Sequence, residues 1–193
     1  MGVRSSFTEE SRGSADVFLR EINAVLAADS LPAYLDPDPP PNVYVGHLFG
    51  RSALDHHSSR VLALIAEQAT QRKRSPNLAL IRGNPYRVVY IPEKRLAPHV
   101  TQYRERIDGS LVQIWVGSLH GMLEELRTLA DGLDIPMVNG QISDETAVAI
   151  NDFKLLSKTD TTELIEDWRT AWLALYEGAR LAAANAIALT LAG

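Results

Sequence analysis

The sequence predicts an α+β fold, in which a small, mostly antiparallel sheet is covered by several α-helices and the C-terminal half is helical. Runs rich in Val, Ile, Tyr and Trp lie within Val43–Gly46, Leu78–Ile91 and Leu111–Val116, and these three segments should supply the sheet. Apolar residues recur at helical spacing over most of the remaining chain. With 46% apolar and 22% charged residues, the composition is that of a globular protein with a core. We expect residues 1–193 to form a single domain, with residues 1–13 flexible.

In the N-terminal third, the spacing predicts a helix over Ser14–Ala28, with Ser14 as its N-cap. Four prolines between residues 37 and 41 exclude a helix or a central strand there and indicate a rigid surface connection within the domain. A short strand over Val43–Gly46 and a helix from Ser52 to Thr70 follow.

The middle of the chain has the strongest β signal. Two β-prone runs, residues 78–82 and 86–91, flank the turn residues Gly83-Asn84-Pro85 and predict a hairpin. A helix with Pro98 in its first turn is predicted next, from the spacing of Leu96, Val100, Tyr103 and Ile107. Leu111–Val116 then predicts a further strand.

The C-terminal part predicts three helices. Ser118 is the expected N-cap of the first, which should stop near Gly132, and Ser143 is the expected start of the second. The third should begin at Asp160, whose Glu163 partner resembles a capping box, and extend to Ala186. Trp168 and Trp172, four residues apart in this helix, are expected in the core.

Several classes of function are excluded or disfavoured by composition. The absence of cysteine excludes a thiolate nucleophile and a cysteine zinc site. The start of the chain shows no secretory signal, and the longest apolar run, Leu181–Ala192, has twelve residues where a spanning helix needs about twenty. We therefore expect a cytoplasmic protein without a membrane segment.

The net charge of −5 is unevenly distributed, with +7 in residues 60–106 between flanks of −4 and −8. This pattern indicates either an anion-binding patch or charge matching between neighbouring elements, and we favour the second. The candidate residues for phosphate binding and base stacking lie in and around Gly83-Asn84-Pro85-Tyr86-Arg87: Arg82, Arg87, Arg95, Arg104, Arg106, Tyr86, Tyr90 and Tyr103. Because the sequence pI is near 5.5, we do not expect nucleic acid as a partner.

A polar cluster between Gly46 and Arg60 contains three of the five histidines. Histidine and aspartate are potential metal ligands, and a histidine beside a serine could act as a general base. These residues define a candidate pocket, which we call the alternative pocket: His47, Arg51, Asp55, His56 and His57. Adjacent residues on a helix point about 100° apart, so His56 and His57 do not form a chelating pair. The competing interpretation is a capped helix start whose histidines pack locally.

Acidic side chains gather in the C-terminal part. Paired carboxylates can act as acid and base or hold Mg²⁺, but most of these residues stand at predicted helix starts, where acidic residues stabilise the helix. Their best functional use is an acidic face that meets a basic protein partner, and the candidates are Asp144, Glu145, Asp160, Glu163, Glu166 and Asp167. No metalloprotease, phosphate-loop or nucleophile-elbow motif occurs, so we assign no catalytic residue, metal ligand or cofactor.

The segment Trp115–Pro136 reads as a strand, a turn, a leucine-rich helix and a Leu-x-Ile-Pro ending. It resembles the corresponding unit of bacterial immunity proteins that neutralise polymorphic toxins, over about twenty-two of the 193 residues. The resemblance implies a small, acidic, cytoplasmic protein that binds and blocks a cognate toxin, and it transfers no functional residue. The leading hypothesis is therefore an immunity-type inhibitor, and the alternative is a small hydrolase-like or metal-dependent enzyme that uses the His47–Arg60 cluster.

Overall fold

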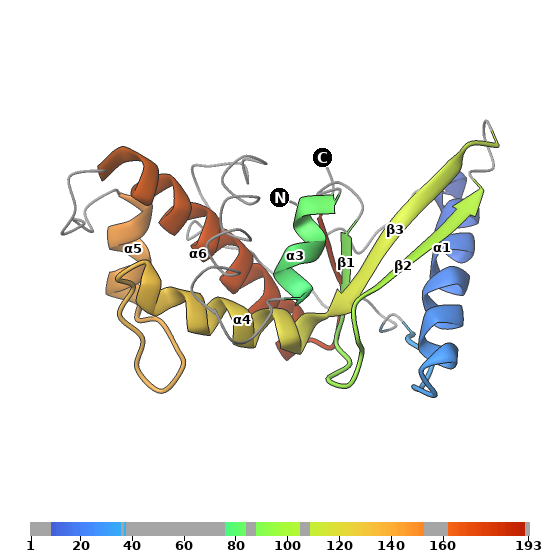
Figure 1. Ribbon diagram of the computed structural model, residues 1–193, viewed down its shortest axis with the longest axis horizontal. Helices are drawn as coiled ribbons and strands as arrows, with labels where there is room; N and C mark the ends of the chain where they lie inside the picture. Colours follow the sequence, from blue (N-terminus) through green and yellow to red (C-terminus); the bar gives the residue numbers. More distant parts are fainter. Residues whose placement is uncertain are drawn as a thin grey trace.

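The computed structural model describes residues 9–35, 37, 76–83, 88–104, 109–152 and 162–191, and these form an α+β fold (Figure 1). In chain order, the described elements are α1 (Glu9–Ala28), α3 (Pro76–Gly83), β1 (Val88–Ile91), β2 (His99–Arg104), β3 (Leu111–Ser118), α4 (Leu119–Gly132), α5 (Asp144–Asn151), α6 (Thr162–Ala184) and β4 (Leu189–Leu191).

The four described strands form one mixed sheet in the order β2-β3-β1-β4. β2 and β3 pair antiparallel, with Val100 opposite Trp115, while β1 pairs parallel with β3, with Val88 opposite Trp115. β4 pairs antiparallel with the other edge of β1. β1 thus lies inside the sheet, and all four of its residues are buried.

Two hydrophobic cores lie on opposite faces of this sheet. On one face, α1 places Ile22 and Leu26 against Val89, Ile114 and Val116. On the other, α3, α4 and α6 pack against Val88, Tyr90, Leu189 and Leu191. Because successive residues of a strand point to opposite faces, β1 contributes to both cores. Figure 1 shows α1 at one end of the molecule and α5, with the first half of α6, at the other.

The helical part confirms three predictions. Ser118 and Ser143 cap α4 and α5 as expected, each by accepting a backbone N–H from three residues later. α4 ends at Gly132, as predicted. Trp172 is fully buried, and Trp168 packs at the border of the same core.

The predicted hairpin over residues 78–91 is wrong, because residues 76–83 form α3. A short apolar run such as Leu78–Arg82 has no periodicity that separates strand from helix, and the outcome depends on a distant contact. The Glu125 carboxylate of α4 accepts N–H bonds from Asn77 and Leu78, at 3.0 and 2.7 Å, at the start of α3. It thereby satisfies N–H groups that a helix start leaves without partners.

The helix predicted through Leu96, Val100, Tyr103 and Ile107 is also wrong, because residues 99–104 form β2. Val, Thr and Tyr in this segment favour a strand, and pairing along β3 stabilises that conformation.

Three smaller differences concern the ends of elements. α1 begins at Glu9, so Ser14 lies inside it and is not the N-cap. α6 ends at Ala184, and Ala186 has a left-handed φ of 52° that turns the chain into β4, which the sequence did not predict. The strand predicted over Val43–Gly46, the helix predicted over residues 52–70 and the start at Asp160 lie outside the described residues.

Candidate functional site

Two of the six predicted partner-binding residues stand together on the surface. Asp144 and Glu145 form the first turn of α5, and both side chains are exposed. Hydrogen bonds from its own backbone N–H and from the Ser143 hydroxyl lower the pKa of Glu145, so this carboxylate stays ionised. These two carboxylates also lie at the positive end of the α5 dipole.

None of the other four predicted acidic residues has a side chain that the structure describes as exposed. Glu166 lies in α6 and is half-buried. Glu163 and Asp167 belong to the same helix, but their side chains are outside the described part, as is the whole of Asp160. Of the predicted side chains that the structure describes, Asp144 and Glu145 are the two that it brings together.

The alternative pocket lies entirely outside the described residues, since these end at residue 37 and resume at residue 76: His47, Arg51, Asp55, His56 and His57. Its role stays a prediction. Within the described ranges, no three His, Cys, Asp or Glu side chains are grouped so that they could hold a metal ion.

The predicted phosphate-binding patch is weakened by the residues that the structure describes. Tyr90 is fully buried, and its hydroxyl donates to the Asn77 carbonyl at 2.8 Å, so it does not stack on a base. Arg95 is exposed and lies 3.6 Å from the Glu93 carboxylate. Arg82 belongs to α3, and Tyr103 and Arg104 belong to β2, but the side chains of all three are not described. Tyr86, Arg87 and Arg106 lie outside the described part.

The basic side chains described in α4 and α6 are all engaged within the protein. Arg127 binds Glu124 at 2.6 Å, and Arg180 binds Glu177 at 2.6 Å. Arg169 is 1% exposed and donates to the Leu133 carbonyl at 2.7 Å, with Asp134 3.8 Å away. Three positive charges are thus held in place by internal contacts.

Six carboxylates of the same region are exposed, and we call them the acidic helical surface: Glu124, Asp131, Asp134, Asp144, Glu145 and Asp152. Asp131, Asp144 and Glu145 have no basic group within 4 Å among the described residues. Among the residues that the structure describes, no cation neutralises these three carboxylates at contact distance. Sequence reasoning missed Glu124 and Asp131, although the polar stripe of 124, 128 and 131 on α4 has helical spacing.

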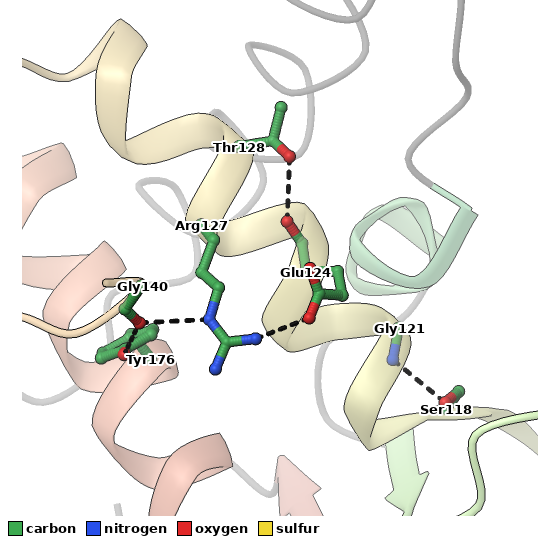
Figure 2. A network of polar contacts seen from close by, with 7 residues as sticks. All are labelled: Ser118, Gly121, Glu124, Arg127, Thr128, Gly140 and Tyr176. Atoms are coloured by element: carbon green, nitrogen blue, oxygen red, sulfur yellow. Dashed lines mark hydrogen bonds and ion pairs between the residues drawn. The ribbon is translucent and has the colours of Figure 1, made fainter. Parts of the chain in front are cut away.

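A tight loop between α4 and α5 fixes the position of the acidic α5 start. Val138 and Gln141 pair as an isolated bridge, and Asn139 and Gly140 both adopt left-handed φ values, of 53° and 72°. The Gly140 carbonyl accepts the Tyr176 hydroxyl at 2.8 Å and the Arg127 Nε at 3.2 Å (Figure 2). α4 and α6 thereby hold the same carbonyl, three residues before Ser143.

No described helix is long and apolar enough to cross a membrane.

Comparison with known proteins gives one match. The model of a family described as "Putative DNA-mimic protein" matches residues 79–191, which span α3 to β4 and include the whole acidic helical surface. No curated protein and no solved structure matches the chain.

Proposed function

Since the chain belongs to the DNA-mimic protein family, we propose that its acidic helical surface binds a DNA-binding protein at the site where that protein holds nucleic acid. The match covers more than half of the chain and contains every element that carries the exposed carboxylates.

The proposal depends on one observation: in residues 119–191, the acidic and the basic side chains differ in number and in their contacts. Residues 119–191 contain twelve acidic and five basic side chains. All three basic side chains described there contact a carboxylate of the protein, and Arg169 is buried. Six described carboxylates face solvent, and only Glu124 and Asp134 among them lie within 4 Å of a described arginine. DNA-binding proteins hold phosphates mainly with lysine and arginine. Exposed carboxylates are negatively charged, as phosphates are, and can therefore bind the same lysine and arginine side chains.

The charge density limits how much of a duplex the surface can imitate. At 1.5 Å per residue, the 14 residues of α4, which carries Glu124 and Asp131, span about 21 Å. A duplex of that length carries about 12 phosphate charges, well above the six carboxylates of the acidic helical surface. We therefore expect the chain to occupy part of a DNA-binding site and to bind with a weaker salt dependence than DNA.

The immunity-type role is a narrower form of the same proposal. A toxin that cleaves or modifies DNA is itself a DNA-binding protein, so a cognate nuclease toxin would be one partner of this kind. The family match supports protein binding and gives no separate support to toxin neutralisation.

The experiment compares the wild-type chain with a neutralised variant. Both are immobilised and exposed to an extract of the source cells, and each retained protein is purified and tested for binding to a labelled duplex. The variant carries Asp131→Asn, Asp144→Asn and Glu145→Gln, which preserve side-chain size and remove the three carboxylates that have no basic group within 4 Å in the described part of the chain.

We expect the wild-type chain to retain a protein that binds DNA, and the variant to retain much less of it. Retained proteins without DNA-binding activity, or equal retention by both chains, would contradict the proposal. A variant with wild-type circular dichroism and Tm excludes misfolding as the reason for lost binding.

A further inference from the structure

A cavity of about 220 Å³ lies between the start of α5 and the C-terminal half of α6. Ser143, Asp144 and Ala147 line it from the α5 side, and Tyr176, Glu177 and Arg180 line it from α6. A water molecule occupies about 30 Å³ in the liquid, so the cavity has room for several non-hydrogen atoms of a guest.

The described lining of the cavity contains two carboxylates, Asp144 and Glu177, and one basic group, Arg180. The nearly buried Glu177 carboxylate accepts both Arg180 Nε and Nη2, at 3.0 and 2.6 Å, so this pair is neutral as a unit. Asp144 is exposed and has no basic group within 4 Å among the described residues. The hydrogen bond to Glu177 raises the pKa of Arg180, and the charges of Glu177, Tyr176 and Asp144 add to this.

The remaining walls suit a long amphipathic side chain. Ile142 is half-buried and offers an apolar contact for a methylene stem, while Tyr176 and Ala147 are buried behind the surface that a guest would touch. Gln141 and Ser143 bring polar groups to the same space. A cationic, planar donor group beside Asp144 would neutralise the lining and place its N–H donors against oxygen acceptors.

We propose that this cavity receives an arginine side chain of the protein partner, with the guanidinium at the Asp144 carboxylate. The proposal rests on the proposed function and specifies where the partner is anchored. Arginine is a common phosphate-binding residue of DNA-binding proteins, so occupying one would remove it from DNA.

The probe is N-acetyl-arginine N-methylamide, and its matched control is the corresponding citrulline derivative, which has nearly the same shape and no charge. Each is titrated into the isotopically labelled full chain at constant ionic strength, and backbone amide shifts are followed by NMR. We expect the arginine derivative to shift the amides of residues 141–147 and 176–180, and the citrulline derivative to leave them unchanged.

Substitutions at two neighbouring residues distinguish binding in the cavity from attraction to the negative charge of the surface in general. Asp144 lines the cavity and Glu145 does not, although both lie in the first turn of α5 and carry the same charge. Asp144→Asn should weaken binding of the arginine derivative by about fivefold or more, which corresponds to about 1 kcal/mol. Glu145→Gln should change it less than twofold.

Shifts spread over the whole acidic helical surface, equal shifts with citrulline, equal losses in the two variants, or no shift at all would each overturn the arginine site. None of these results affects capture of a DNA-binding protein by the acidic helical surface as a whole. Conversely, an arginine-selective cavity in a chain that retains no DNA-binding protein would leave the site intact and defeat the proposed function.

Discussion

Arg180 donates to the Glu177 carboxylate at 2.6 Å from one turn further along α6, and the Glu177 side chain is only 6% exposed. The pair gives a buried carboxylate its counterion and, at the same time, removes a positive charge from the acidic helical surface. It therefore connects the stability of α6 with the charge that the surface presents.

Arg180→Gln should lower the free energy of unfolding by about 2 kcal/mol, below the roughly 3–5 kcal/mol expected for a fully buried pair, because Arg180 is itself half exposed. Glu177→Gln should cost less, since the released guanidinium can turn to solvent. Urea denaturation of both variants measures the difference, and an equal loss in the two would show that the carboxylate does not depend on Arg180.

Glu125 should matter for stability because its carboxylate accepts three N–H groups at the start of α3. In Glu125→Gln, the amide NH2 group would face these N–H donors, so we expect the free energy of unfolding to fall by about 1–3 kcal/mol. Glu124→Gln is the control, because that side chain is exposed and bound only within α4. Comparable losses in the two variants would contradict this role of Glu125.

Glu125 should also make the free energy of unfolding depend on pH. Burial raises the pKa of Glu125 above its ordinary value of 4.5, although the N–H groups of Leu78 and Asn77 act against this. Between 4.5 and the raised value, the folded protein binds more protons than the unfolded chain, so this group lowers stability as pH rises through that window. Denaturation at several pH values should show this component in the wild type and not in Glu125→Gln.

Gly121 and Gly132 should respond oppositely to alanine. A Cβ on Gly121 would lie 2.4 Å from Asn77 Nδ2, an atom that Glu125 holds at 2.8 Å. Gly121→Ala should therefore cost about 1–3 kcal/mol. A Cβ on Gly132 would meet nothing within 4 Å, so Gly132→Ala should stabilise α4 by about 0.4–1 kcal/mol. Thermal unfolding of both variants is the measurement, and a stabilised Gly121→Ala would refute the close approach.

His120 should titrate below its usual pKa of about 6.5, first because of burial and then because of Lys94. Protonation then favours the unfolded chain, so this group reduces stability as pH falls from about 6.5 through the folded pKa. An NMR titration of the imidazole gives the midpoint directly. Lys94→Gln should raise it part of the way, since burial remains, and an unchanged midpoint would rule out the Lys94 contribution.

The elements that sequence predicts well are those whose signals are local. α4 and α5 begin at serines that cap them through their own side chains, and β3 is rich in β-branched and aromatic residues. For such segments, neighbouring residues already determine the conformation, and the α+β class follows from them.

Where prediction failed, the deciding contact is distant in sequence. Residues 76–83 are helical where Glu125 satisfies their first N–H groups from 47 and 48 residues away. β2 depends on pairing with β3, and the three-residue β4 depends on pairing with β1. A periodicity of apolar residues does not contain this information.

Sequence predicts only part of the acidic helical surface. The sequence identifies Asp144 and Glu145 as candidates because they belong to the acidic residues that gather in the C-terminal part. Arg127 and Arg169 also donate to the carbonyls of Gly140 and Leu133, 13 and 36 residues away, and sequence does not reveal these contacts. The pairs Arg127–Glu124 and Arg180–Glu177 are local, at i,i+3 spacing.

A competition titration tests the DNA-mimic role most directly. A DNA-binding protein retained by the chain is mixed with a labelled duplex, and the apparent Kd of the duplex is measured at increasing concentrations of the chain. We predict that the apparent Kd rises in proportion to the chain concentration without a plateau, as it does when two ligands exclude each other. An apparent Kd that levels off, or a ternary complex of chain, partner and duplex, would contradict the proposal.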